Sequence, residues 1–150
     1  MRDGILHIGP SAAGETVFLS GGAQDSIPLE VLIPGPEVSA RPLILTAPIS
    51  FWGGVDPKTS RIADVRHPQH GMEIAGTILF LSGTIGSSSA SAILLELIHR
   101  DLAPAAIIMR EPDAILLLGV IVAREMGWAG MGAFRAGPDD LPMTVTHAAV

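Results

Sequence analysis

Cysteine and tyrosine are absent from this sequence, and charged residues are scarce. Without cysteine the chain cannot by itself hold a disulfide, a thiolate nucleophile, a cysteine zinc site or a conventional iron–sulfur cluster. Charged residues make up only 16% of the 150 residues against 48% hydrophobic ones, a balance that excludes an intrinsically disordered chain. The formal net charge of −6 argues against a surface that binds nucleic acid or anionic membrane.

Long apolar runs are also lacking. The longest, residues 114–123, is about half of the roughly 20 residues that a membrane-spanning helix needs, and Arg124 ends it. No basic segment followed by an apolar one opens the sequence, so we expect a cytoplasmic protein. The length is typical of one domain, and the mean hydropathy of +0.47 indicates that part of the surface faces a partner.

Short apolar runs separated by turn residues predict a mixed α/β domain. One helix is expected over residues 92–100, where the apolar residues recur at helical spacing, and a second runs from Glu111-Pro112-Asp113 to Gly127. Strands are expected at residues 16–19, 30–33, 43–46, 77–81, 105–109 and 144–147. This order predicts a layered α/β domain that lacks the repeated βαβ units of a Rossmann fold.

The sequence GTIGSSSAS at residues 83–91 is a glycine- and serine-rich loop between an expected strand and an expected helix. The first N–H groups of a helix have no partner inside the helix and carry partial positive charge, so such a loop can hold a carboxylate or phosphate. Gly86 would let a bound group approach the backbone, and the serines add donors. No lysine follows the last glycine, which excludes a Walker loop. The plainer interpretation is that one serine caps the helix and the others are solvated.

A second loop, PISFWGGVDP at residues 48–57, has an aromatic pair before two glycines. It predicts a rigid loop with a tight turn, held by Phe51 and Trp52 as packing anchors. Glu111 and Asp113 flank a proline and most simply serve the start of the second helix.

Histidines give little support for other chemistry. His67 and His70 with Asp64 would make a metal site, but an intervening proline breaks the helical spacing, so we interpret them as loop residues. A serine nucleophile at Ser87 would need a partner base, and no spacing ties these histidines or His99 to it.

Three strings together, PISFWGGVDP, GTIGSSSAS and APAAIIMREPD (residues 103–113), resemble the small subunit, or swivelling domain, of the aconitase X enzymes. The resemblance covers about residues 40–127 of a single domain, residues 1–150, with residues 1–39 as an N-terminal extension. It implies an α/β fold, the swivelling β/β/α layered domain, present here as a separate chain.

The resemblance also implies a lyase that removes water from a hydroxy acid and is active only with a large catalytic subunit. That partner would hold the iron–sulfur cluster or iron, and this chain would hold no metal and no cofactor. In such domains the first serine after the loop glycine is the catalytic base, which corresponds to Ser87 here. Gly86, Ser88 and Ser89 would then bind substrate.

Ile85 departs from the family pattern, since members that act on a phosphorylated substrate carry Arg or Lys there. A phosphate favours charge-assisted hydrogen bonds, so an apolar residue favours an acid without phosphate. We therefore expect cis-3-hydroxy-L-proline as the substrate, with mevalonate 5-phosphate as the alternative. A further alternative is a non-catalytic binding or structural β/β/α module whose serine loop only caps a helix.

Overall fold

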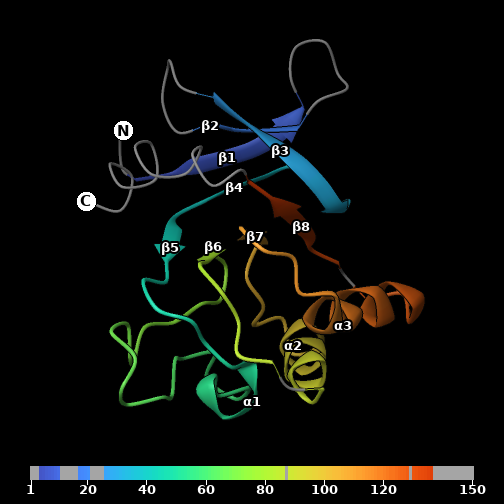
Figure 1. Cartoon of the computed structure of the whole chain (residues 1–150). Coiled ribbons are helices and arrows are strands. Elements are labelled where there is room, and N and C mark those ends of the chain that lie inside the picture. Colours follow the sequence, from blue (N-terminus) through green and yellow to red (C-terminus); the bar gives the residue numbers. More distant parts are fainter. Residues whose placement is uncertain (1–3, 11–16, 21–25, 87, 129, 137–150) are drawn as a thin grey trace.

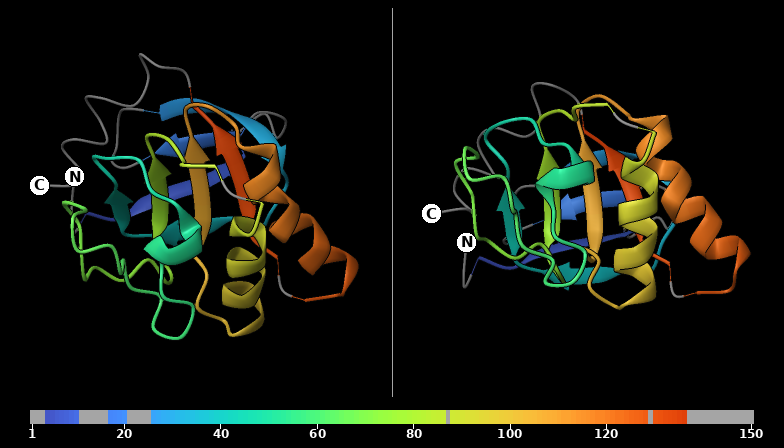
Figure 2. Two further views of the ribbon diagram at one scale, coloured as in Figure 1. Left: turned by 60° about the horizontal axis from the view of Figure 1, so that its bottom comes forward. Right: turned by 90° about the horizontal axis from the view of Figure 1, so that it is seen from below.

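Two layers of β-strands and one layer of helices make up the computed structural model, which describes residues 4–10, 17–20, 26–86, 88–128 and 130–136. In chain order the elements are β1 (Leu6–Pro10), β2 (Val17–Ser20), β3 (Ser26–Ile33), β4 (Val38–Ala40), β5 (Pro42–Ile44), α1 (Phe51–Gly54), β6 (Ile78–Leu81), α2 (Ala90–His99), β7 (Ala106–Met109), α3 (Ala114–Glu125) and β8 (Gly132–Arg135). Strands β1–β4 form one layer, β5–β8 form the middle layer, and the helices cover the outer face of the middle layer (Figure 1 and Figure 2). The expected β/β/α layering is confirmed.

The eight described strands form one sheet in the order β4-β1-β2-β3-β8-β7-β6-β5. The long strand β3 joins the two layers, because its first half pairs with β2 and its second half with β8, both antiparallel. Strands β5, β6, β7 and β8 pair in parallel. The two outermost strands, β4 and β5, are separated only by Arg41, so the sheet curls round until its ends nearly meet.

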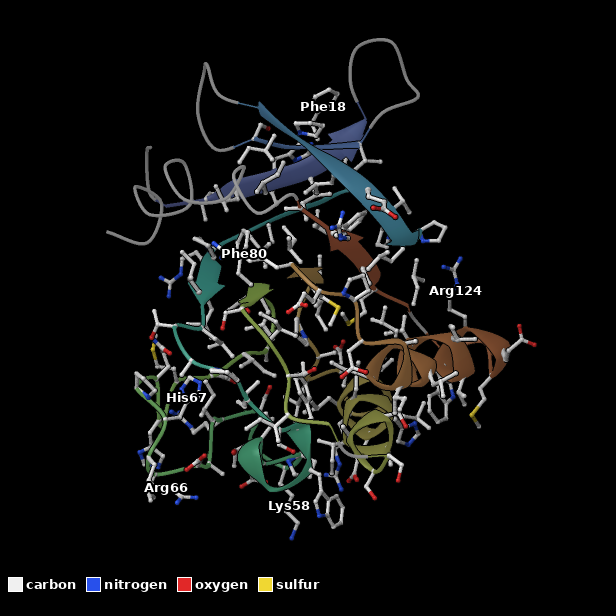
Figure 3. The ribbon with its side chains drawn as sticks, viewed as in Figure 1. Phe18, Lys58, Arg66, His67, Phe80 and Arg124 are labelled. Atoms are coloured by element: carbon white, nitrogen blue, oxygen red, sulfur yellow. The ribbon has the colours of Figure 1, made fainter. Side chains whose placement is uncertain are left out.

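The middle strands are buried on both faces, as parallel strands between two layers must be. In β6, Leu79 and Leu81 belong to the apolar cluster under the helices, whereas Ile78 and Phe80 belong to the cluster between the two β layers. Figure 3 shows Phe80 near the antiparallel layer. The same alternation continues in β7 and in Ala133 and Phe134 of β8, and burial on both faces explains why β6 and β7 are continuous apolar runs in the sequence.

Helices α2 and α3 connect parallel neighbours and pack against each other on one face of the sheet (Figure 2). A Cβ on Gly119 of α3 would lie 2.5 Å from the carbonyl oxygen of Ser91 in α2, so the glycine permits the close approach of the two helices. Helix α3 starts at its N-cap Asp113 and is followed by Gly127, whose φ of +76° suits the turn after a helix.

The structure confirms most of the expected elements. Both helices and five of the six expected strands are present with small shifts of their ends, and the strand expected at residues 144–147 lies outside the described residues. Three of the described strands, β1, β4 and β8, were not anticipated. No helix in the described part of the chain is both long enough and apolar enough to cross a membrane.

The expected loop at residues 48–57 contains the short turn α1, and only one of its two aromatic side chains anchors it. Phe51 is buried, but 58% of Trp52 is exposed, so the expectation that Trp52 pins the turn is wrong. Trp52, with a ψ of 109°, and Gly53, with a φ of +84°, both lie outside the helical region, so the turn does not continue as a regular helix.

Candidate functional site

The three strings singled out in the sequence follow the carboxyl ends of three neighbouring parallel strands. Residues 48–57 come after β5, residues 83–91 after β6, and the end of the third string, residues 110–113, after β7. Parallel strands place these ends at one edge of the sheet, which is where ligands bind in open parallel sheets. The fold therefore collects the three strings at one edge.

Backbone hydrogen bonds join the first two strings. The Ile49 N–H donates to the carbonyl of Gly83 (3.3 Å), and the Ile85 N–H donates to the carbonyl of Ile49 (2.9 Å). These bonds form an isolated parallel bridge between Ile49 and Thr84 that extends the β5–β6 pairing into the loops. The position of the serine loop is thus tied to that of the loop that carries Trp52.

A side-chain hydrogen bond joins the second string to the third. The Thr84 hydroxyl donates to Oδ2 of Asp113 at 2.7 Å, and the bond is partly buried. Oδ1 of the same carboxylate accepts from the N–H groups of Ile115 and Leu116 and so caps α3. The expectation that Asp113 serves the helix start is confirmed. Sequence reasoning missed Thr84, because no local rule connects a threonine to a carboxylate 29 residues away.

The serine loop leads directly into α2. Gly86 is exposed, and a Cβ there would meet nothing within 4 Å, so the space in front of it is open. Ser88 is exposed, and its carbonyl accepts from the Ser91 hydroxyl. Ser89 occupies the N-cap position of α2, although its hydroxyl is not the capping acceptor for this helix. Ser87 lies outside the described residues.

The loop histidines have structural surroundings. His67 is only 6% exposed; its Nδ1 accepts from the Gln69 N–H and its Nε2 donates to the carbonyl of Ala47. Figure 3 shows His67 within the loop segment and Arg66 at its outer edge. His70 is exposed. Among the described residues no three His, Asp or Glu side chains gather where they could hold a metal ion. With no cysteine in the chain either, its donor set does not fit an iron–sulfur cluster.

Apolar side chains are exposed at this edge and along α3. Trp52 and Ile85 are each 58% exposed in the two joined loops. Four apolar residues of α3 and its C-cap Met126 are between 39% and 55% exposed; the four are Ile115, Leu118, Ile121 and Val122. Two cavities, of about 400 and 490 Å³, lie at the opposite, amino-terminal ends of the parallel strands. The edge that carries the three strings is therefore open and partly apolar.

Curated relatives match part of this chain. Over 90 residues it is 50% identical to the cis-3-hydroxy-L-proline dehydratase of Pseudomonas aeruginosa, a match that covers 59% of this chain and 16% of that protein. Over 81 residues it is 42% identical to the phosphomevalonate dehydratase small subunit of Methanothermobacter thermautotrophicus, with coverage of 54% and 62%. The chain thus spans less than two thirds of the length of either relative.

A solved structure and a family model extend the similarity to most of the chain. The crystal structure of Thermococcus kodakaraensis aconitase X in its holo-form superposes with a TM-score of 0.62 and 30% identity, over 71% of this chain and 78% of that one. The family model described as the aconitase X swivel domain matches residues 27–147. The resemblance noted in the sequence is therefore confirmed, and the chain belongs to the aconitase X swivel domain family.

Proposed function

We propose that this chain is the small subunit of a two-chain hydro-lyase that dehydrates a hydroxy acid, with residues 1–150 as one swivelling domain. The observation that carries the proposal is the convergence of the three family strings at one sheet edge, through the bonds of Ile49 to Gly83 and Ile85 and of Thr84 to Asp113. The named dehydratases among its relatives support the reaction class. The cytoplasm is the proposed location.

Ser87 is the proposed base, and Gly86, Ser88 and Ser89 are the proposed substrate contacts. The serine alkoxide takes the proton from the carbon next to the substrate carboxylate, the hydroxyl on the adjacent carbon leaves as hydroxide, and a double bond forms between the two carbons. The proton that the serine has taken then converts the hydroxide to water, which restores the alkoxide. A serine is a weak acid, so its anion needs stabilisation. The start of α2 follows this loop directly, and its N–H groups and partial positive charge favour both an alkoxide and a bound carboxylate.

The proposed substrate is cis-3-hydroxy-L-proline, which gives a cyclic imine after loss of water. Two observations support it: the 50% identity to a dehydratase of that name, and the exposed Ile85 where a phosphate would favour a cation. Mevalonate 5-phosphate is the second candidate, because a relative that is itself a small subunit has that activity in its name.

The proposed partner is a large catalytic subunit that holds the iron–sulfur cluster or iron centre. Its presence explains why Trp52, Ile85 and one face of α3 are exposed. A helix that is apolar on all sides is normally buried, and α3 has apolar residues on the face that α2 and the sheet leave open. A patch of this kind on a protein surface typically marks an interaction site.

Co-expression with the large chain, followed by assay of both acids, tests the proposal. We expect dehydration of cis-3-hydroxy-L-proline by the pair and by neither chain alone. Ser87→Ala should lower kcat by at least about a hundredfold, because general bases typically contribute that much. Ser82→Ala is the matched control, since Ser82 is exposed just after β6 and has no proposed role.

Each alternative has its own outcome. Turnover of mevalonate 5-phosphate alone would replace the substrate and keep the reaction class. An assembled pair that dehydrates neither acid would leave the non-catalytic module as the better interpretation. Full activity of Ser87→Ala would remove Ser87 as the base.

A further inference from the structure

We propose that α3 holds the serine loop from both sides, and that Thr84 and Asp113 are positioning residues of the proposed dehydratase site. The inference rests on the proposed function, because it assigns a purpose to the geometry of the loop that carries Ser87. Thr84, near the start of the loop, is bonded to Asp113, and Ser91, its last residue, lies against Gly119.

The segment around Thr84 makes hydrogen bonds to two other parts of the chain. The backbone around Thr84 is bonded to Ile49 on one side, and its side chain is bonded to Asp113 on the other. The glycines on either side of this segment, Gly83 and Gly86, have wide conformational freedom. A Cβ would make only a 3.9 Å contact at Gly83 and none within 4 Å at Gly86. The Thr84 side chain therefore provides an anchor that its glycine neighbours cannot provide.

Asp113 is well suited to hold a loop, because its carboxylate is itself fixed. Oδ1 accepts from two N–H groups of the first turn of α3, at 3.0 and 3.1 Å, which leaves Oδ2 for the Thr84 hydroxyl. A hydrogen bond to an ionised carboxylate is stronger than one between neutral groups. The position of Thr84 is therefore set by the start of α3.

The other side of the loop depends on the same helix. Gly119 lies one and a half turns into α3 and lets the backbone of α2 at Ser91 approach closely. Thr84 and Ser91 bracket the six residues from 85 to 90. Both ends of this segment thus contact the same rigid element, α3 with its N-cap. A catalytic group needs such support to stay within a fraction of an ångström of its working position.

The test compares Thr84→Val with Thr84→Ser in the assembled two-chain enzyme. Valine keeps the shape and loses the hydroxyl. A misplacement on the order of 1 Å costs about a hundredfold in rate, so we expect Thr84→Val to lower kcat by about ten- to a hundredfold, with KM changed by less than about threefold. Thr84→Ser keeps the hydroxyl and should restore kcat to within about threefold of the original rate.

Thr77→Val is the matched control. Thr77 precedes β6 as Thr84 follows it, and its hydroxyl makes a partly buried bond of 2.8 Å to the carbonyl of Ile74. The two valine substitutions should lower the thermal midpoint by similar amounts, but Thr77→Val should leave kcat unchanged. Equal losses of kcat in both would reduce the role of Thr84 to general stability and overturn the proposal.

Asp113→Ser gives a second route to the same bond. Serine is a good N-cap, so α3 keeps its cap, but its single short hydroxyl cannot also reach Thr84. If the bond itself matters, Asp113→Ser should lower kcat about as much as Thr84→Val, and the double variant should be no slower than either. If the double variant instead lost kcat by the product of the two single losses, the two residues would act independently and the proposal would be overturned.

The outcomes separate this proposal from the one on which it rests. If Ser87→Ala is inactive while Thr84→Val and Asp113→Ser keep full kcat, the positioning role is wrong and the proposed function stands. If Ser87→Ala is fully active, the assignment of the base fails whatever the two positioning variants do.

Discussion

The two halves of the molecule have different roles. The parallel half, β5–β8 with its helices, carries the candidate site, and the antiparallel half, β1–β4, covers one face of the parallel strands. All three strings that resemble the family belong to the parallel half, two of them after β5 and β6 and the third in and after β7. Parallel strands bring their carboxyl ends to one edge, so successive loops converge there, whereas antiparallel strands send successive loops to opposite edges. Strand direction alone thus explains why the candidate site belongs to one half.

The antiparallel half supplies the cover that the parallel strands need. Ile78, Phe80 and Ile108 would face water without β1–β3, whose Leu6, Leu19 and other apolar side chains pack against them. Because β6, β7 and β8 contribute to both apolar clusters, the two halves share their central layer. We therefore expect the two halves to unfold together.

Truncation of one leucine in each cluster tests this expectation and has the largest predicted effect. Leu94 of α2 and Leu19 of β2 are both 0% exposed, and they belong to the helical and the inter-sheet cluster, respectively. Each Leu→Ala change should lower the free energy of unfolding by about 2–5 kcal/mol, through lost burial and the cavity that remains. Urea unfolding followed by tryptophan fluorescence and by far-UV circular dichroism measures both.

The shape of the transition decides between one unit and two. If the halves are coupled, both variants shift the same single transition, and the two probes stay coincident. A Leu19→Ala protein that loses its circular dichroism in two steps would show instead that the antiparallel half unfolds by itself.

The sequence predicts all the strands of the parallel half except β8, but only β2 and β3 of the antiparallel half, and the difference has a physical reason. Strands buried on both faces are dense apolar runs, as in ILFL of β6, and helix α3 has clear start and stop residues in Asp113 and Gly127. Strands β1 and β4 are short and have one covered face, so their pattern hardly differs from that of a loop. Their pairing depends on residues distant in sequence, such as Leu6 with Ala40.

The local segments of the candidate site could be predicted from the sequence, but the hydrogen bond that joins two of them could not. The serine loop, its place before a helix and the cap at Asp113 all follow from local rules. The bond from Thr84 to Asp113 does not, because it forms only when β6 and β7 are neighbours. Nor does the difference between the buried Phe51 and the exposed Trp52, two adjacent aromatic residues that local rules do not tell apart.

Gly119→Ala should have an intermediate effect and acts on the helical side alone. The new Cβ would lie 2.5 Å from the Ser91 carbonyl oxygen and 3.2 Å from the Leu95 nitrogen, both backbone atoms of α2 that cannot move independently. Alanine favours the helix by up to about 1 kcal/mol over glycine, but the overlap outweighs this gain. We expect a net loss of about 1–3 kcal/mol in urea unfolding.

A control on the same helix isolates the overlap. Leu118 is 49% exposed, so Leu118→Ala should change the stability of the isolated chain by less than about 1 kcal/mol. A Gly119→Ala protein as stable as the original would mean that α2 and α3 separate without cost. The close approach that links α3 to the serine loop would then lose its support.

The smallest effect is expected where the two halves meet at the surface. Arg135 of β8 and Glu30 of β3 face each other across the antiparallel pair, with 3.4 Å between Nη1 and Oε1 and side chains 40% and 60% exposed. Exposed pairs contribute about 0.2–1 kcal/mol and weaken with salt, so Glu30→Gln should cost no more than that in low salt and almost nothing in high salt.

Glu96→Gln in the comparably exposed Glu96–Arg100 pair of α2 is the matched control, because that pair lies within one helix. If Glu30→Gln costs clearly more than Glu96→Gln, the charge pair would itself help to join β3 to β8. Equal costs would leave the backbone pairing of β3 with β8 and the shared apolar clusters as what holds the two halves together.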